Sequence, residues 1–125
     1  MEEVVCTRTV INCPNYDACY RYYRDVLEWP IFVEYRGERR GACFGTRVWG
    51  IEIIDVPDAP RDDGRTRGAF EVPDVRALHA RLKAQLPDLP DIEQERWADS
   101  FIATAPDGYR IKFFTRTVPA GSLPA

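Results

Sequence analysis

The stretch "IATAPDGYRIKFFT", residues 102–115, carries the strongest indication of a fold in this sequence. An Asp-Gly dipeptide in its middle is typical of a tight turn, with a strand on each side of it. In the second strand, Ile111 and Phe113 are apolar and would face a core. Lys112 and Phe114 alternate with them and would face the opposite side of the sheet. The sequence therefore raises the question of whether that opposite side is solvated surface or the wall of a site.

The composition of the chain limits its possible partners. It has 125 residues, of which 45% are hydrophobic, which is enough for a single domain with a core. The formal net charge is −3, so nothing favours nucleic acid or an anionic membrane as the main partner. No apolar run approaches the roughly 20 residues that span a bilayer, and the acidic N-terminus does not resemble a signal peptide. We expect a soluble, cytoplasmic protein.

Outward from residues 102–115, the same order of elements occurs twice. Hydrophobic periodicity predicts strand, helix, strand, strand, strand, then a proline-rich linker, then the same order again. A repeat of this kind predicts an α+β fold with two tandem βαβββ modules, which form a curved mixed sheet with a concave cleft and helices on the outer face. The single domain 1–125 would comprise module one at about 4–56, a linker at 57–65, module two at about 66–116 and a loose tail at 117–125. The expected helices cover residues 16–28 and 74–85.

Three motifs resemble a known superfamily. They are "INCPNYDACYRYYRDVLEW" (11–29), "GAFEVPDVRALHARLKA" (68–84) and "TAPDGYRIKFF" (104–114). Together they resemble the vicinal oxygen chelate proteins, that is, the glyoxalase/bleomycin-resistance/dioxygenase superfamily, over nearly the whole chain from about Val4 to Thr115. Each motif is modest alone, but their order and spacing agree with that family.

The resemblance also implies where a metal site would lie. The family's ligands, commonly histidine and glutamate, correspond to Arg8, Glu52, Arg67 and Lys112 of this sequence. Only Glu52 keeps a metal-binding side chain, because arginine and lysine offer hydrogen-bond donors and no lone pair. The resemblance therefore implies a metal-free member without a cofactor, in which these four side chains face the concave cleft. In an alternative interpretation, the cations only form a structural network with Glu52 and Glu71.

Aromatic residues are the other candidates for the lining of a cleft, because small-molecule pockets combine rings with a few polar groups. Strand parity selects six of them, although the two tryptophans could instead belong to a core or a dimer interface: Tyr35, Phe44, Trp49, Trp97, Phe101 and Phe114.

Two functional hypotheses remain open. The first is a small-molecule-binding protein, which the resemblance implies to be a homodimer that sequesters a planar hydrophobic or anionic natural product, as in antibiotic resistance. The second is a metal-independent lyase or isomerase, with Glu52 as general base and Arg8 or Arg67 stabilising an oxyanion. Three cations near Glu52 would lower its basicity, which favours binding over catalysis.

The remaining chemically active side chains receive structural roles. The four cysteines, Cys6, Cys13, Cys19 and Cys43, form no CxxC pair, so we expect reduced thiols in the core and no zinc site. The single histidine, His79, lies on the second helix, away from the expected cleft. Asp107 and Gly108 are assigned to the turn alone.

Overall fold

The computed structural model describes residues 1–119 and 121, and it divides into two compact units. Unit 1 comprises Met1–Asp62 together with Pro106–Gly108, and unit 2 comprises Asp63–Ala105 and the chain from Tyr109 onward. The division falls inside the predicted linker, but the turn at 106–108 belongs to the first unit. The predicted loose tail lies in part outside the described residues, at 120 and 122–125.

Unit 1 contains a mixed four-stranded sheet in the order β1-β4-β3-β2. Its first strand is parallel to the last, and the other two pairs are antiparallel. The parallel pair needs a long crossover, which the helical segment provides. The strands are β1 (Thr7–Cys13), β2 (Ile31–Arg36), β3 (Arg40–Gly45) and β4 (Trp49–Asp55).

The first helix differs from the sequence prediction of one regular helix over 16–28. An α-helix, α1 (Tyr16–Arg21), is followed by a π-helical turn, η1 (Tyr22–Val26). There the amide of Leu27 donates to the carbonyl of Tyr22, five residues back, at 2.9 Å. The wider turn lets two consecutive residues, Tyr22 and Tyr23, both point inward, with 4% and 1% of their surface exposed.

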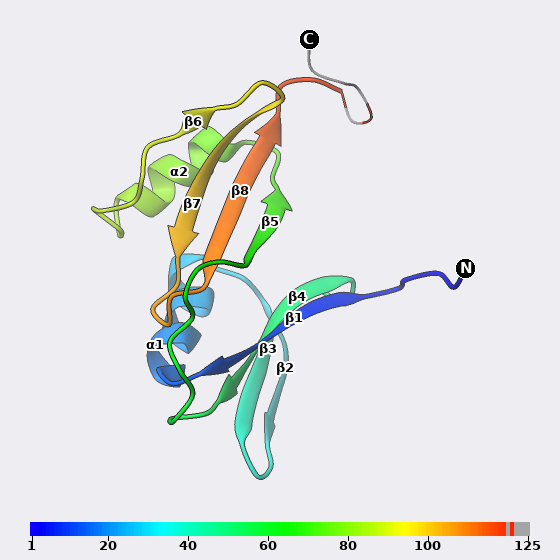
Figure 1. Ribbon diagram of the computed structural model, residues 1–125, viewed down its shortest axis with the longest axis vertical. Coiled ribbons are helices and arrows are strands. Elements are labelled where there is room, and N and C mark those ends of the chain that lie inside the picture. The colour runs from blue at the N-terminus through cyan, green and yellow to red at the C-terminus, as the bar shows by residue number, and fades with distance from the viewer. Residues whose placement is uncertain (120, 122–125) are drawn as a thin grey trace. The chain divides into compact units, whose positions relative to one another are not determined.

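Unit 2 repeats the order of elements with a second mixed sheet, β5-β8-β7-β6. Its helix, α2 (Val75–Lys83), begins where the side chain of Asp74 accepts a hydrogen bond from the amide of Ala77 at 3.0 Å. The strands are β5 (Arg67–Glu71), β6 (Glu93–Gln94), β7 (Ala98–Thr104) and β8 (Arg110–Arg116). The α+β class and the two βαβββ modules are therefore confirmed, with one four-stranded sheet in each module (Figure 1).

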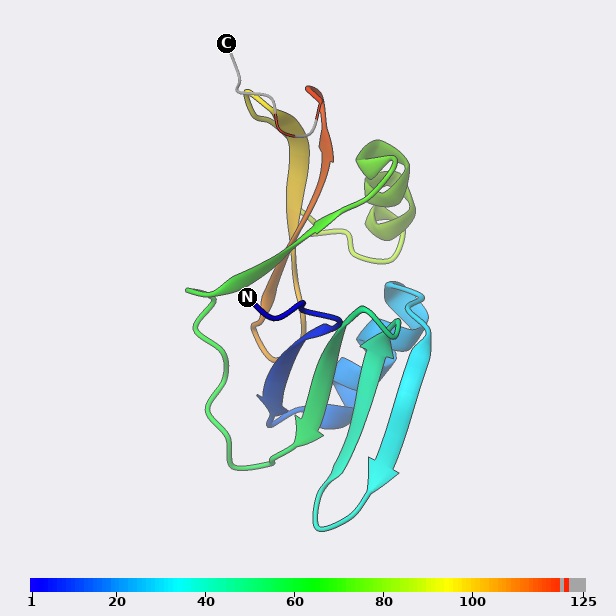
Figure 2. The ribbon, with the colours of Figure 1, turned by 90° about the vertical axis from the view of Figure 1, so that its right-hand side faces the viewer.

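In each unit the helix covers one face of the sheet (Figure 2). On the covered face of unit 1, the ring of Phe44 stacks on Tyr23 at 5.5 Å between centroids. On the covered face of unit 2, Phe101 and Phe113 lie 5.5 Å apart, and the imidazole of His79 meets Phe101 edge-on at 5.0 Å. His79 therefore belongs to the helix side, as expected. Burial of these rings supplies most of the local driving force for each unit.

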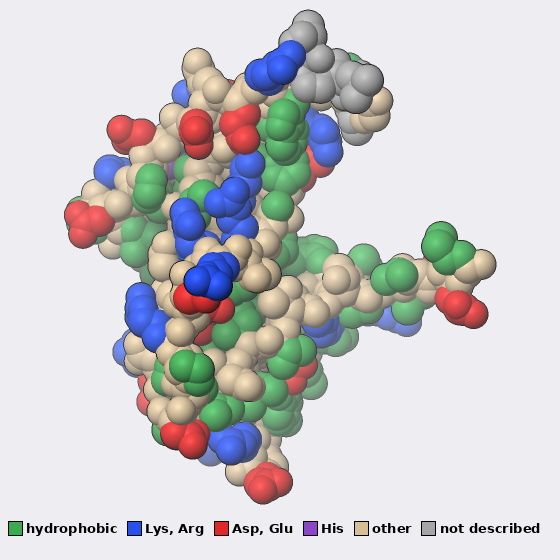
Figure 3. All heavy atoms as spheres, in the orientation of Figure 1, with side chains coloured by type: hydrophobic (Ala, Val, Ile, Leu, Met, Phe, Trp, Pro, Cys, Tyr) green, Lys and Arg blue, Asp and Glu red, His purple; other side chains and the backbone are tan. Residues whose placement is uncertain are grey.

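The N-terminal arm precedes β1 rather than forming its start, because the strand begins at Thr7 and not at the expected Val4. Hydrophobic side chains are prominent along this arm (Figure 3), where Val4 and Val5 are 81% and 72% exposed. Within the described residues, none of the helices combines the length and the apolar character that crossing a membrane requires.

Candidate functional site: the open sheet faces

Each sheet has an open face, by which we mean the face that its own helix does not cover. In unit 1 the open face carries Arg8, Phe32, Tyr35 and Glu52. The register explains this placement, because Glu52 pairs with Cys43 and Tyr35 pairs with Gly41, two residues further along the same side of the sheet. Gly41 leaves room for the ring of Tyr35, because the Cβ atom of any other residue at position 41 would collide with that ring.

The guanidinium of Arg8 is held against an aromatic ring. It lies 4.9 Å from the centroid of Phe32, and its Nη2 donates to the carbonyl of Thr46 at 3.0 Å. Nη1 is buried beside Gly50 and has no hydrogen-bond partner among the described residues. The open face of unit 1 therefore presents a positioned cation with an unused donor.

The carboxylate of Glu52 is already engaged. The hydroxyl of Tyr35 donates to its Oε2 at 2.5 Å. Burial and this hydrogen bond raise the pKa of Tyr35 to about 12, so the phenol stays protonated and remains the donor. This bond uses part of the accepting capacity of the Glu52 carboxylate and fixes its position on the open face.

The open face of unit 2 contains a charged pair inside an aromatic frame. The Nζ atom of Lys112 lies 2.9 Å from Glu95 and 5.4 Å from the centroid of Trp97. Trp97 in turn meets Phe114 edge-on at 5.3 Å. The hydroxyl of Ser100 donates to Glu95 at 2.7 Å. Hydrogen bonds from Ser100 and then Lys112 lower the pKa of Glu95, so this carboxyl stays ionised.

The predicted site residues therefore separate into two groups. Arg8, Tyr35 and Glu52 lie together on one open face, and Lys112, Trp97 and Phe114 lie together on the other. Arg67 is exposed at the start of β5, and its charge contributes to the lowered pKa of Glu95. Because Arg67 pairs with Arg110, it shares the side of the sheet that carries Lys112.

Three of the predicted wall residues lie on the covered faces instead. Phe44 stacks in the core of unit 1, Phe101 packs in the core of unit 2, and Trp49 meets Trp29 edge-on at 5.0 Å. Their assignment to a cleft wall by strand parity is wrong. In β3 the reason is visible, because all five residues from Gly41 to Gly45 are buried and the burial pattern no longer alternates.

The ion pairs among the described residues differ from the structural network expected for the cations with Glu52 and Glu71. Lys112 pairs with Glu95, which the sequence analysis did not consider, and Glu71 pairs with Arg116 at 3.5 Å. Sequence reasoning also missed Phe32 and Ser100. The sequence pattern gave little indication of Phe32, because it lies at a bulge in β2. It gave little indication of Glu95, the acceptor of Ser100, because Glu95 precedes β7 outside any regular alternation.

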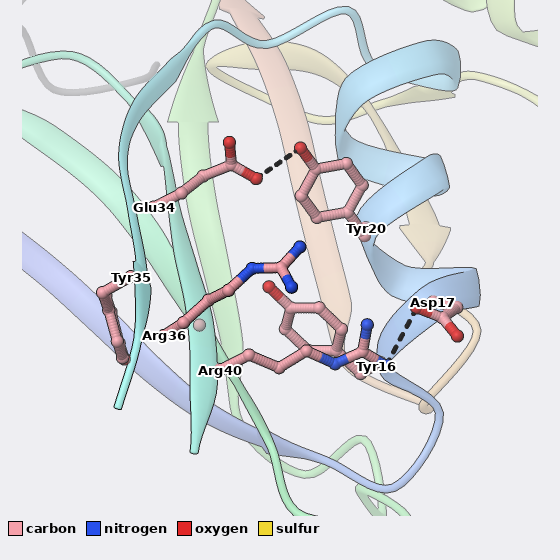
Figure 4. A pocket seen from close by; sticks show the side chains of 8 residues that line it. Tyr16, Asp17, Tyr20, Glu34, Tyr35, Arg36 and Arg40 are labelled. Atoms are coloured by element: carbon pink, nitrogen blue, oxygen red, sulfur yellow. Dashed lines mark hydrogen bonds and ion pairs between the residues drawn. The ribbon is translucent and has the colours of Figure 1, made fainter. Parts of the chain in front are cut away.

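A groove on the covered side of unit 1 is the other concave feature. It has a volume of about 390 Å³ and lies between α1 and β2 (Figure 4). The hydroxyl of Tyr20 donates to Glu34 at 2.6 Å, and Arg40 pairs with Asp17 at 3.0 Å. The guanidinium of Arg36 also points into it. These polar groups face one another across the helix and the strand, so the groove is separate from the open face.

The donor sets on the open faces do not fit a divalent metal. At the four positions that the family resemblance indicates, Arg8, Arg67 and Lys112 have no lone pair to offer. The fourth, Glu52, accepts from Tyr35 instead. One carboxylate and three side chains that only donate hydrogen bonds do not make a metal site, so no chemistry through a metal follows from these residues.

Comparison with known proteins agrees with this architecture. The family model of the Glyoxalase/Bleomycin resistance protein/Dioxygenase superfamily matches residues 6–113, and the chain belongs to that superfamily. A search of curated proteins gave no match.

Solved structures show the same fold at low sequence identity. The chain is similar to a glyoxalase family protein from Enterococcus faecalis, with TM-score 0.71 and 15% identity, covering 91% of this chain and 98% of that one. It is similar to lactoylglutathione lyase from Agrobacterium tumefaciens, with TM-score 0.65, 19% identity and coverages of 92% and 96%. It is also similar to TnmS3, an antibiotic binding protein from Streptomyces sp. CB03234, with TM-score 0.67, 17% identity and coverages of 93% and 100%.

Proposed function

We propose that this protein is a metal-independent small-molecule-binding protein of the glyoxalase/bleomycin-resistance type, which sequesters a planar hydrophobic or anionic natural product. One observation carries the proposal. At positions where the family places metal ligands, Arg8 lies against Phe32 and Lys112 lies against Trp97. Cations held beside rings bind planar anionic molecules directly, by stacking and by charge-assisted hydrogen bonds.

Details of each face support a ligand of this class. The guanidinium of Arg8 is held by Phe32 and by the carbonyl of Thr46, which fixes the orientation in which it would meet a carboxylate or phenolate oxygen. On the other face, Trp97 and Phe114 provide aromatic surface beside Lys112. The structural similarity to an antibiotic binding protein supports the same class of ligand, although at 17% identity it establishes only the shared fold.

The enzymatic alternative, a lyase or isomerase with Glu52 as base and Arg8 or Arg67 as oxyanion stabiliser, has less support. Glu52 accepts a 2.5 Å hydrogen bond from Tyr35, so part of its accepting capacity is already used before a substrate binds. We also propose, from the family resemblance, that the protein acts as a homodimer in the cytoplasm, which light scattering of the purified protein and fractionation of cells would test.

The test is a binding titration in buffer to which no divalent metal is added. A panel of planar aromatic natural products, with and without an acidic group, is titrated against the protein while tryptophan fluorescence is followed. We expect at least one compound to bind. Arg8→Met or Lys112→Met should lower the affinity for acidic compounds about tenfold, which corresponds to about 1.4 kcal/mol of binding free energy. Arg47→Met, at an exposed arginine between β3 and β4, is the matched control and should leave binding unchanged.

Two results would contradict the proposal: no binding across the panel, or equal effects of the Arg8 and Arg47 variants. Turnover of a bound compound that is lost in Glu52→Gln would instead favour the lyase or isomerase alternative.

A further inference from the structure

The core of unit 1 contains a buried polar cluster that belongs neither to the open face nor to the groove. Cys13 ends β1, Cys19 lies in α1, and Asp107 comes from the turn at 106–108. Both cysteines have 0% of their surface exposed and Asp107 has 2%. Each side chain offers one ligand atom, and the three atoms lie within 4.8 Å of one another.

The spacing of these atoms is close to that of a zinc coordination sphere. With bonds of about 2.3 Å to sulfur and about 2.0 Å to oxygen, a tetrahedral Zn²⁺ holds sulfur and oxygen ligands about 3.5 Å apart. It holds two sulfur ligands about 3.8 Å apart. Sγ of Cys13 lies 3.2 Å from Oδ2 of Asp107. That distance is about 0.3 Å shorter than the sulfur–oxygen spacing around zinc, and the two distances to Cys19 are no longer than 4.8 Å.

A second observation comes from the π-helical turn. The hydroxyls of Tyr22 and Tyr23 are buried and have no hydrogen-bond partner among the described residues. Burial first, and then the charge of Asp107, raise the pKa of both tyrosines, with a further contribution from Cys19. Tyr22 and Tyr23 follow Cys19 by three and four positions in the helical segment, so their side chains lie on the face of the helix that carries Cys19. A buried donor without an acceptor is costly, so something in this cluster should supply one.

When both cysteines are protonated thiols, the two tyrosine hydroxyls still lack a strong acceptor. In the absence of a cation, the thiol of Cys13 donates to Oδ2 of Asp107. A bound cation reverses the balance, because a coordinating thiol is deprotonated. The resulting thiolates are strong acceptors for the tyrosine hydroxyls, in the way that hydrogen bonds commonly support metal ligands.

We propose that Cys13, Cys19 and Asp107 form a structural site for a thiophilic divalent cation, Zn²⁺, in the core of unit 1. Binding releases two thiol protons to solvent and leaves two thiolates and one carboxylate around the ion. Thiolate ligands select zinc over magnesium or calcium. A tyrosine hydroxyl or a water oxygen takes the fourth position. The ion ties β1, α1 and the 106–108 turn together, which is a role distinct from ligand binding on the open faces.

The experiment uses the full chain, expressed with zinc in the medium and then dialysed against metal-free buffer. Elemental analysis should find about one zinc per chain. Cys13→Ser and Asp107→Asn should each lose most of it. Cys43→Ser is the matched control, because Cys43 is also buried but lies outside the cluster, and it should keep the metal. Cobalt substituted for zinc should show the charge-transfer absorption of thiolate ligands, which Cys13→Ser should reduce by about half.

Further measurements keep the proposal open to refutation if a cysteine variant misfolds. In the unaltered protein, a chelator should raise the rate at which two thiols react with a thiol reagent, and zinc should reverse this. Glu52→Gln should keep the zinc, because Glu52 lies on the open face. Failure to take up zinc, a Cys13–Cys19 disulfide in the purified protein, or zinc lost from Glu52→Gln but not from Asp107→Asn would each overturn the proposal. Only the last of these results would also count against a metal-independent open face.

Discussion

The two units share one order of elements but have different interiors. Unit 2 has an apolar interior in which Val75 and Leu82 of α2 cover the rings of Phe101 and Phe113. Unit 1 encloses two thiols, a carboxyl group and two tyrosine hydroxyls beside its rings. A regular amphipathic helix suffices for the first interior, whereas the second needs a π-helical turn to direct two consecutive tyrosines inward. The same topology therefore does not prescribe the chemistry of the core.

The open faces differ in a complementary way. Lys112 of unit 2 is neutralised by Glu95, which Ser100 also supports. Arg8 of unit 1 has no acidic partner in the contacts described above and lies against Phe32. Unit 1 thus offers the less satisfied cation, and unit 2 offers the larger aromatic surface. The predictions below test whether this difference between the units is real.

The largest expected effect concerns the covered faces. Phe44→Ala should lower the free energy of unfolding by about 3–5 kcal/mol, because it removes a fully buried ring and leaves a cavity. Phe101→Ala should do the same in unit 2. Urea denaturation followed by circular dichroism measures both changes. Phe32→Ala is the control, since this ring is 50% exposed, and it should cost less than about 1 kcal/mol. Equal costs for Phe32 and Phe44 would show that the two faces of unit 1 are misassigned.

The next effect concerns the charged pair of unit 2. Glu95→Ala should destabilise the protein by about 1–2 kcal/mol, because it leaves the largely buried ammonium of Lys112 and the buried hydroxyl of Ser100 without their acceptor. Glu93→Ala, in the neighbouring strand β6, is the exposed control and should change little. If Glu95→Ala leaves the free energy of unfolding unchanged, the pair is solvated, as in an ordinary surface salt bridge.

The same pair has a pH dependence. Because the folded-state pKa of Glu95 lies below the usual glutamate pKa of 4.5, the unfolded chain takes up the proton first as the pH falls. The stabilising contribution is therefore complete above pH 4.5 and is lost as the pH drops through the lower folded-state value. Glu95→Gln should flatten this acid-side decline in the urea midpoint. If the urea midpoint of Glu95→Gln falls as steeply with decreasing pH as that of the unaltered protein, the lowered pKa of Glu95 is contradicted.

Sequence alone predicted the repeated βαβββ order because each element carries its own periodicity, as in Ile111 and Phe113 of β8. It placed Lys112 on the face opposite the helix for the same reason. It failed for Phe44, because a strand with every residue buried gives no alternation to read. It failed for the π-helical turn because the same tyrosines are compatible with a regular helical stripe.

Contacts between distant segments were beyond the reach of pattern analysis. Asp107 was assigned to a turn, yet its side chain lies in the core of unit 1, 94 residues along the chain from Cys13. Glu95 lies between β6 and β7, and Lys112 lies in β8. The antiparallel pairings of β6 with β7 and of β7 with β8 bring them together, and no local signal specifies these registers. A single sequence indicates which strands and helices form, whereas the hydrogen-bond partners of a polar side chain depend on how the strands pair in the folded sheet.

A smaller effect distinguishes the two helix starts. Asp74→Ala should cost about 1 kcal/mol, because the Asp74 side chain caps the amide of Ala77. Asn15 occupies the equivalent position before α1, but its side chain makes no capping hydrogen bond, so Asn15→Ala should have almost no effect on stability. Thermal unfolding of the two variants in parallel gives the comparison. A loss of similar size at both positions would show that the first helix is capped after all.

The smallest expected effect concerns the open face of unit 1. Tyr35→Phe removes the hydroxyl that donates to Glu52, but Tyr35 is 36% exposed, so water replaces the bond and the cost should be about 0.5 kcal/mol. Tyr20→Phe is matched to it, because it removes a similar bond to Glu34 on the covered side. The two variants should have similar stability in urea denaturation. In the ligand titration, only Tyr35→Phe frees the Glu52 carboxylate on the face of Arg8, so only this variant should lower the affinity for acidic compounds. If both variants bind those compounds equally well, the Tyr35–Glu52 pair has no part in recognition, and the site must lie elsewhere on the protein.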